Sequence, residues 1–190
     1  VGHTVSELLA SKPVIMTERK NTFEDGILTL SIEFLHLLLL IIIANGAPVL
    51  VRLLLKDHLD LAVDFGRNFA DDNRIFGSSK TWRGVIAALL VTPIAASALG
   101  YSFETGGHIA LFAVLGDLFS SFIKRRLGMA PSSKAFLLDQ VPESLMPALI
   151  VMQNFHLGVT DISLLVFVFL IVDLVMTYML YHWRILQKKP

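Results

Sequence analysis

An almost uninterrupted apolar run extends from Ile27 to Ala44, with the sequence ILTLSIEFLHLLLLIIIA. At about 1.5 Å per residue, a helix of this length crosses the roughly 30 Å hydrocarbon core of a bilayer. The hydrophobic content of the whole chain, 54%, also exceeds the roughly 45–50% that is usual for soluble domains even when glycine is counted. The chain is therefore predicted to be an integral membrane protein.

Four more apolar segments are expected to form membrane helices: Val85–Tyr101, His108–Ile123, Glu143–Phe155 and Ile162–Tyr181. The predicted fold class is all-α, with five transmembrane helices and two polar cytoplasmic loops. Two regions are expected along the chain. They are a polar, extracytoplasmic N-terminal extension over residues 1–26 and a five-span membrane domain over residues 27–190.

The first helix is expected to break at residues 45–48, Asn-Gly-Ala-Pro, and to resume over residues 49–55. Pro48 lacks an amide donor and clashes with the preceding turn. A broken helix frees backbone carbonyl groups, which a membrane tolerates only where they are buried in protein or line a wet cavity. Asn45 is therefore either a substrate or ion contact or simply part of a kink.

The basic residues gather on one side of the predicted bilayer. Thirteen of the 16 Lys and Arg residues lie in the loops at 45–84 and 124–142 or at the C-terminus, which alternating spans place on the same side. Cytoplasmic loops carry an excess of Lys and Arg. We therefore expect the N-terminus outside, and the C-terminus and both polar loops in the cytoplasm, where nucleotides are available.

Polar and charged residues share one face of the third span. In a helix, Asp117, Ser121, Lys124 and Arg125 are spaced i, i+4, i+7 and i+8. Carboxylate oxygen suits a hard metal ion, and Lys and Arg suit phosphate charge, so this face favours a site for a metal ion and a polyphosphate. The alternative is a buried helix whose Asp is paired by a neighbouring cation and whose Lys-Arg-Arg run is a cytoplasmic anchor.

Other polar residues have both a functional and a structural interpretation. Glu33 and His36, in the first span, either mark function or satisfy each other, whereas Asp173 is better explained as an interior hydrogen-bonding partner. Residues 77–84, GSSKTWRG, lack the glycine before Lys80 and the preceding strand of a nucleotide P-loop, yet these residue types can bind phosphate. The chain has no Cys, which excludes thiolate metal sites and Cys nucleophiles.

Four blocks, in this order, resemble the CDP-archaeol synthases, small five-span relatives of the phosphatidate cytidylyltransferases. The blocks are Asn45-x-x-Pro48, Asp72-Asn73-Arg74-x-Phe76-Gly77-x-x-Lys80-Thr81-Trp82-Arg83-Gly84, Gly116-Asp117-x-x-x-Ser121-Phe122-x-Lys124-Arg125-Arg126-Leu127-Gly128 and Leu138-Asp139-Gln140. The resemblance covers about residues 40–150, and its most specific parts are the KTWRG and GDxxxSFxKRRLG blocks.

The resemblance implies transfer of a cytidylyl group from CTP to a membrane lipid phosphate, giving a CDP-lipid and pyrophosphate for phospholipid biosynthesis. It implies that Asp117 and Asp139 hold Mg²⁺, and that Lys124 and Arg125 neutralise the triphosphate, which makes these four the expected catalytic residues. The residues expected to bind substrate are Asn45, Arg74, Lys80, Thr81, Arg83 and Ser121. The expected partners are CTP, a lipid phosphate and the bilayer; no nucleic acid is expected, and nothing specifies an oligomer.

The sequence departs from the family pattern beside Asp139. The family usually has a second Asp three residues further on, where this chain has Pro142 followed by Glu143, so a second metal ligand depends on Glu143. The lipid stays open between an archaeal isoprenoid ether phosphate, phosphatidate and a diverged relative. The alternative function is a non-catalytic membrane subunit or small transporter, in which the ionisable residues of the first and last spans form a polar pathway.

Overall fold

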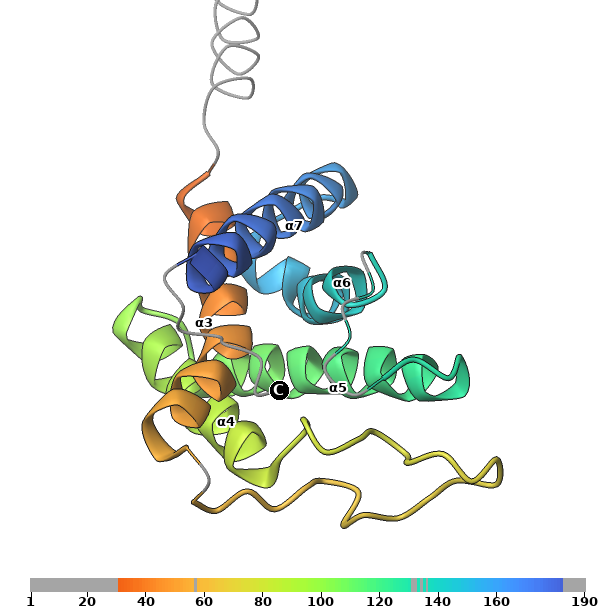
Figure 1. Ribbon diagram of the computed structural model, residues 1–190. Coiled ribbons are helices and arrows are strands. Elements are labelled where there is room, and N and C mark those ends of the chain that lie inside the picture. Colours follow the sequence, from red (N-terminus) through yellow and green to blue (C-terminus); the bar gives the residue numbers. More distant parts are fainter. Residues whose placement is uncertain (1–30, 57, 131–132, 134, 136, 183–190) are drawn as a thin grey trace, which may run out of the picture. The chain divides into compact units, whose positions relative to one another are not determined.

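A computed structural model of the chain describes residues 31–56, 58–130, 133, 135 and 137–182. The chain divides into two compact units, Val1–Ile32 and Glu33–Pro190, and the second contains the helical body. Its elements in chain order are α3 (Ile32–Leu55), α4 (Trp82–Ala98), α5 (Phe103–Arg126), α6 (Gln140–Val151), the 3₁₀ turn η1 (Met152–Phe155) and α7 (Val159–His182) (Figure 1). Since the described residues form helices and only two isolated β-bridges, the all-α prediction is confirmed.

Among the residues that the structure describes, three helices are long and apolar enough to cross a membrane. They are α3, α5 and α7, with mean hydropathies of 2.4, 1.5 and 2.5. Helix α4 is apolar but has 17 residues, and α6 has 12. The chain is an integral membrane protein, while the count of five spans and the membrane side of each loop stay predictions. The expected N-terminal extension, residues 1–26, lies outside the described residues.

The predicted break in the first helix is wrong. Helix α3 continues from Ile32 to Leu55 with Pro48 inside it. A proline within a helix removes the hydrogen bond to the carbonyl four residues earlier, here that of Ala44, and its ring crowds that carbonyl. The Asn45 amide donates to the Ile41 carbonyl at 3.0 Å, and the Pro48 ring packs against Gly84 of α4, so tertiary contacts hold the helix together.

The other helices begin earlier than their apolar stretches suggest. Helix α5 begins at Phe103 instead of His108, because the Ser102 hydroxyl accepts a 3.0 Å hydrogen bond from the Thr105 amide and caps the first turn. Helix α6 begins at Gln140, three residues before the expected start, and ends at Val151, where η1 continues the chain. The first turns of these helices are polar, so they lie outside the apolar stretches from which the helix starts were predicted.

A buried apolar core joins α3, α5, α6 and α7. Its fully buried members include Leu37, Leu40, Ile41, Ile109, Val151, Phe155 and Leu165. Two glycines of α5 allow close helix contacts on either side. A Cβ at Gly106 would lie 2.5 Å from Pro93 Cα of α4, and one at Gly116 would lie 2.3 Å from the Pro142 carbonyl oxygen of α6. Side chains at either position would force the helices apart.

The two short connections of the body lie together, away from the polar loops. Tyr101, after α4, stacks on Phe155 of η1 with ring centroids 4.3 Å apart, and its hydroxyl meets His36 Nδ1 at 3.1 Å. Asn154 likewise donates to the Thr105 hydroxyl at 3.3 Å. Of the two alternatives for Glu33 and His36, function or a mutual pair, neither is decided by this contact, which joins His36 to Tyr101.

Candidate functional site

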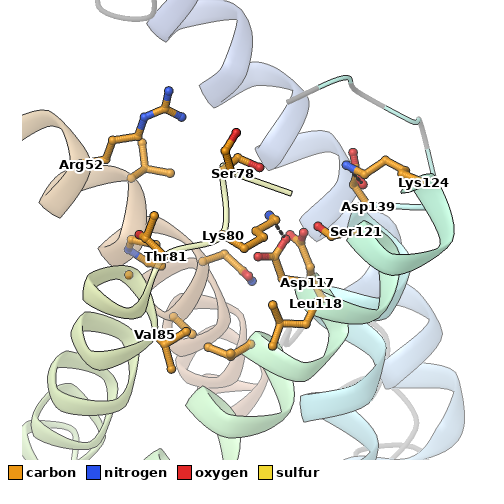
Figure 2. Close-up of a pocket in the computed structure, with 18 of the residues that line it drawn as sticks. Arg52, Ser78, Lys80, Thr81, Val85, Asp117, Leu118, Ser121, Lys124 and Asp139 are labelled. Carbon is orange, nitrogen blue, oxygen red and sulfur yellow. Dashed lines mark hydrogen bonds and ion pairs between the residues drawn. The ribbon is translucent and has the colours of Figure 1, made fainter. Parts of the chain in front are cut away.

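A cavity of about 470 Å³ lies where α3, α5, α6 and α7 meet the polar loops. Nine of the ten predicted site residues line it: Asn45, Lys80, Thr81, Arg83, Asp117, Ser121, Lys124, Arg125 and Asp139. Arg74 is not among its lining residues. Figure 2 shows that α5, the loop before α4 and the segment before α6 send side chains toward the same space. The sequence thus identified the residues that gather here, while their roles stay predictions.

The polar face predicted on α5 is present and largely buried. Ser121, Lys124 and Arg125 are 1%, 6% and 5% exposed, and all three line the cavity together with Asp117. Helix α5 carries these residues into its last turn, where cations also interact favourably with the carbonyl end of the helix dipole. This face therefore gives the cavity a positive wall next to a carboxylate.

Lys124 joins α5 to the segment that carries Asp139. Its ammonium lies 2.7 Å from Asp139 Oδ1 and donates to the Ser133 carbonyl at 3.2 Å. The other oxygen of Asp139 accepts from the Ala135 amide at 3.1 Å. Two of the four predicted catalytic residues are thus paired with each other, and a ligand that binds either one must replace this contact.

Lys80 pairs with a second carboxylate group on the other side of the cavity. Its ammonium forms an ion pair with Asp117 (Figure 2). Glu143 of α6 lies close enough to Asp117 and Lys80 to interact electrostatically with both. Burial would lower the pKa of Lys80, but the neighbouring carboxyl groups of Asp117, Glu143 and Asp139 raise it above its ordinary value. Lys80 is therefore held as a cation at this site.

The contact between α5 and α6 brings Asp117 and Glu143 together. Gly116 and Pro142, the residues directly before them, touch through their backbones, so closely that no side chain fits at Gly116. This backbone contact brings Asp117 and Glu143 to the same cavity. Glu143 had been considered only as a replacement for a missing Asp, and its position near Asp117 is the structural finding.

Asp64 organises the long loop that carries Lys80. Its side chain is buried; one oxygen accepts from the Gly66 amide at 2.9 Å and from Arg74, and the other accepts from the amides of Phe76 and Gly77 at 3.1 and 2.9 Å. Burial alone would raise the pKa of Asp64, but these hydrogen bonds hold it below its ordinary value. Arg74 therefore supports the loop from outside the cavity.

Arg83 also has a structural task. Its guanidinium donates to the carbonyl groups of Lys56 and His58 and lies 2.8 Å from Asp60 Oδ1. These bonds connect the end of the loop to its beginning, below α3. Arg83 lines the cavity, but both terminal nitrogens are already bonded to protein.

Arg126 fastens the same loop to α5. Its guanidinium carbon lies 4.8 Å from the ring centre of Phe69 and 4.9 Å from that of Phe122. One terminal nitrogen lies 2.8 Å from Asp71 Oδ1, and the other donates to the Arg74 carbonyl at 2.8 Å. In the sequence this residue had only the role of an anchor, because the loop aromatics have no pattern that reveals their partner.

Several buried polar atoms of the cavity lining have no hydrogen-bond partner among the described residues. They include Ser121 Oγ, Ser133 Oγ and Arg125 Nε, although Arg125 also donates through another nitrogen to the Ala130 carbonyl at 2.9 Å. Buried polar groups in proteins are nearly always bonded. These atoms are therefore available to a polar ligand.

Asp173 confirms its predicted role as an interior hydrogen-bonding partner. Its Oδ2 accepts from the Gln140 side chain at 3.0 Å, which ties α7 to the start of α6. Both residues also line the cavity. Gln140 and Ser133 were not predicted at the site, since an isolated amide or hydroxyl in a loop gives no signal in the sequence.

The donor set suits Mg²⁺ in part. Within the described residues no cluster of three or more acidic, His or Cys side chains is arranged to hold a metal ion. Magnesium, however, usually binds one or two carboxylates and completes its shell with water and substrate phosphates. The carboxyl groups of Asp117 and Glu143 line the cavity with the Ser121 hydroxyl, which has no hydrogen-bond partner in the part of the chain that the structure describes, and they provide hard oxygen ligands of that kind.

The chain is similar to known proteins of one family. A family model described as CarS-like CDP-archaeol synthase matches residues 27–107 and 99–188. The chain is 40% identical over 126 residues to the CDP-archaeol synthase of Pyrobaculum calidifontis, covering 62% of this chain and 74% of the relative. It is 32% identical over 156 residues to that of Pyrobaculum islandicum, covering 78% and 91%.

A solved structure supports the same assignment. It is described as an intramembrane enzyme for archaeal membrane lipid biosynthesis, and it shares 28% identity with this chain at a TM-score of 0.64. The match covers 75% of this chain and 91% of that one. By its family match, its relatives and its fold, the chain belongs to the CDP-archaeol synthase family.

Proposed function

We propose that the protein is a CTP-dependent cytidylyltransferase that converts a membrane lipid phosphate into a CDP-activated lipid and pyrophosphate. The observation that carries the proposal is one cavity in which cationic side chains and carboxyl groups meet from three segments: the loop before α4, helix α5 and the segment before α6. Lys80, Lys124 and Arg125 provide positive charge, and Asp117 and Asp139 provide the carboxylates. Its volume, about 470 Å³, is within the usual range for small-molecule sites.

The reaction needs alignment and charge neutralisation more than a protein nucleophile. An anionic oxygen of the lipid phosphate attacks the α-phosphorus of CTP, and a new P–O bond forms. The bond from the α-phosphorus to the bridging oxygen breaks, and pyrophosphate leaves with that electron pair. Fixed positive charges lower the repulsion between the two anions and stabilise the charge that develops on the leaving group.

The surroundings of each residue indicate which part of the phosphate binding and charge neutralisation it would provide. Lys124 and Arg125 lie at the buried end of the α5 face, where Arg125 Nε and Ser121 Oγ have no hydrogen-bond partner among the described residues and can bond to phosphate oxygens. Lys80 reaches the cavity from the opposite loop. Mg²⁺ held by Asp117 with Asp139 or Glu143 would supply further neutralisation of the triphosphate.

The cavity also has an apolar wall that suits a lipid. Pro48 and Val49 of α3, Val85 of α4 and Val114 and Leu118 of α5 line it beside the charged groups. Helices α3 and α5 are both candidate membrane spans. We infer that the lipid phosphate enters from the bilayer side and CTP from the cytoplasm. An isoprenoid ether glycerol phosphate is the first candidate because the relatives are CDP-archaeol synthases, and phosphatidate is the second.

The alternative of a subunit or small transporter with a polar pathway has no specific support. Its candidate residues bond locally, Asp173 to Gln140 and His36 to Tyr101. The test is release of pyrophosphate from CTP by the purified protein in detergent with Mg²⁺, offered each lipid phosphate or soluble glycerol phosphate. Release with a lipid only supports the proposal and identifies the lipid. No release with any lipid, from folded protein, contradicts it.

A further inference from the structure

The long loop between α3 and α4 exposes large apolar side chains next to the start of α4 (Figure 1). Leu59, Leu61 and Phe65 are 75%, 54% and 60% exposed, and Trp82, the first residue of α4, is 39% exposed. The rings of Phe65 and Trp82 lie side by side, with their centroids 6.2 Å apart. We call these four residues the apolar collar. An exposed apolar patch of this kind marks a contact with a membrane or with another molecule.

The backbone holds the collar around the first turn of α4. The Trp82 amide donates to the Leu61 carbonyl at 2.9 Å, and the Phe65 amide donates to the Ala62 carbonyl at 3.0 Å. Leu59 and Phe65 have φ angles of 56° and 50°, in the left-handed region that residues with a Cβ rarely adopt. The loop therefore accepts backbone strain at the two collar residues that are most exposed.

The collar continues an exposed apolar stripe of α4. Ile86, Leu90 and Ile94 follow Trp82 at intervals of four residues, and each is more than half exposed. In a membrane protein such a stripe suits contact with lipid. Helix α4 has 17 residues and is about 25 Å long, whereas the hydrocarbon core of a bilayer is about 30 Å thick. The collar therefore adds apolar surface at the level where the helix itself ends.

The charges near the collar are compatible with a membrane surface. Asp60, between the two leucines, lies 2.8 Å from the Arg83 guanidinium, so its negative charge is neutralised within the protein. Lys56 and Arg67 are exposed in the same loop and can meet lipid phosphate groups. Tryptophan is enriched at the boundary between hydrocarbon and water, and long basic side chains reach from that boundary into the water. This composition suits the interfacial layer of a bilayer, where headgroups and acyl chains meet.

We propose that the apolar collar lies in the interfacial layer of the bilayer and holds the loop that carries Lys80 against the membrane surface. The bilayer is the occupant because Leu59 comes four residues after Leu55, where the candidate membrane span α3 ends. The Val63 amide donates to the Lys80 carbonyl at 2.8 Å, so the collar is joined to the backbone that brings Lys80 to the cavity. This membrane contact is independent of the reaction catalysed in the cavity.

The test places a single Trp in the collar of the whole chain, in phosphatidylcholine–phosphatidylglycerol nanodiscs. The two natural tryptophans, Trp82 and Trp183, are replaced by Phe, and Leu61→Trp or Phe65→Trp provides the probe. We expect both probes to lose fluorescence when the lipids carry a nitroxide near the headgroup end of the acyl chain. A nitroxide near the methyl end should quench them less, and iodide in the water should quench them weakly.

Ala70→Trp, in the same background without Trp82 and Trp183, is the matched control. Ala70 is exposed in the same loop but lies outside the collar, next to Asp71 and Asp72. Its probe should be quenched by iodide and by neither labelled lipid. Thermal unfolding of each variant checks that the chain is folded, and the two collar probes are read independently of each other.

The outcomes also separate this inference from the proposed function. Iodide quenching of the folded collar probes as strong as that of Ala70→Trp, without quenching by labelled lipid, overturns the membrane contact. Protection from both quenchers, the result expected if a second copy of the chain covers the collar, also overturns it. Because these readouts need no substrate, either result leaves cytidylyl transfer standing. Lipid quenching of both probes in a protein that releases no pyrophosphate supports the membrane contact and contradicts the function.

Discussion

Replacing Gly116 by Ala should damage the site by separating α5 from α6. The added Cβ would lie 2.3 Å from the Pro142 carbonyl oxygen and 2.9 Å from the Glu143 amide nitrogen, whereas ordinary contacts begin at 3.4 Å. The helices must therefore move apart by roughly 1 Å, given the dense packing of protein interiors. Neither backbone can rotate away as a flexible side chain would.

The size of the effect follows from two terms. Overpacking costs about 1–3 kcal/mol, and the better helix propensity of Ala returns about 1 kcal/mol, so the free energy of unfolding should fall by at most about 2 kcal/mol. Activity should fall much further, because a misplacement of about 1 Å between catalytic groups can cost on the order of 100-fold in rate. Gly116→Ala is therefore expected to fold and to lose most of its kcat.

Two glycines of the same helix provide matched controls. Gly106→Ala places a Cβ 2.5 Å from Pro93 Cα, at the contact with α4, and should destabilise the protein with little loss of kcat. Gly107→Ala meets nothing within 4 Å and should raise stability slightly, with wild-type activity. The assays are thermal unfolding in detergent and CTP-dependent pyrophosphate release. Wild-type kcat in Gly116→Ala, or an equal loss in Gly106→Ala, would refute the reasoning.

Three further results are expected from the long loop. Asp64→Asn should lower the free energy of unfolding by about 2 kcal/mol and raise the KM for CTP, because an amide cannot accept all the hydrogen bonds of the carboxylate; melting temperature and kinetics measure both. In the folded protein the pKa of Asp64 is below its ordinary value of 3.8, so the Asp64 carboxylate stabilises the loop fully above pH 3.8. This stabilisation is lost as the pH falls through the pKa of the folded protein. Over that pH range, protection of the loop from pepsin should fall in the wild type but not in Asp64→Asn. Arg126→Lys should weaken the attachment of the loop to α5 by about 1 kcal/mol and affect KM more than kcat. An ammonium cannot contact the rings of Phe69 and Phe122 and also hydrogen bond to the loop. An unchanged KM would contradict this.

The face of α5 was predictable because helix geometry alone determines it. Asp117, Ser121, Lys124 and Arg125 keep their spacing whatever surrounds the helix, and the structure brings all four to the cavity. Asp139 was assigned to the site only by the family resemblance, as an implied metal ligand, and its ion pair with Lys124 could not be derived from spacing. Local periodicity therefore predicted one wall of the site, and the opposite wall required the fold.

Most of the errors and omissions share a cause, a contact between segments that are apart in the sequence; the late start predicted for α5 instead came from a local cap at Ser102. Pro48 indicated a break, but packing against Gly84 and the continuity of α3 on both sides keep the helix whole. The loop around Asp64 has no periodicity, and its order comes from hydrogen bonds that one carboxylate collects from residues up to 13 positions away. Glu143 was considered for the site only through an absent Asp, because its position near Asp117 depends on how closely α5 and α6 approach.

The most direct test of cytidylyl transfer in this cavity is to follow the phosphates of CTP separately. CTP labelled at the α-phosphate or at the γ-phosphate is incubated with Mg²⁺, an isoprenoid ether glycerol phosphate and either wild-type protein or Asp117→Asn. We expect the α-label to enter the lipid fraction and the γ-label to leave as pyrophosphate with the wild type, and neither to occur with folded Asp117→Asn. Transfer of the γ-label to lipid, or α-label transfer by Asp117→Asn at the wild-type rate, would contradict the assignment.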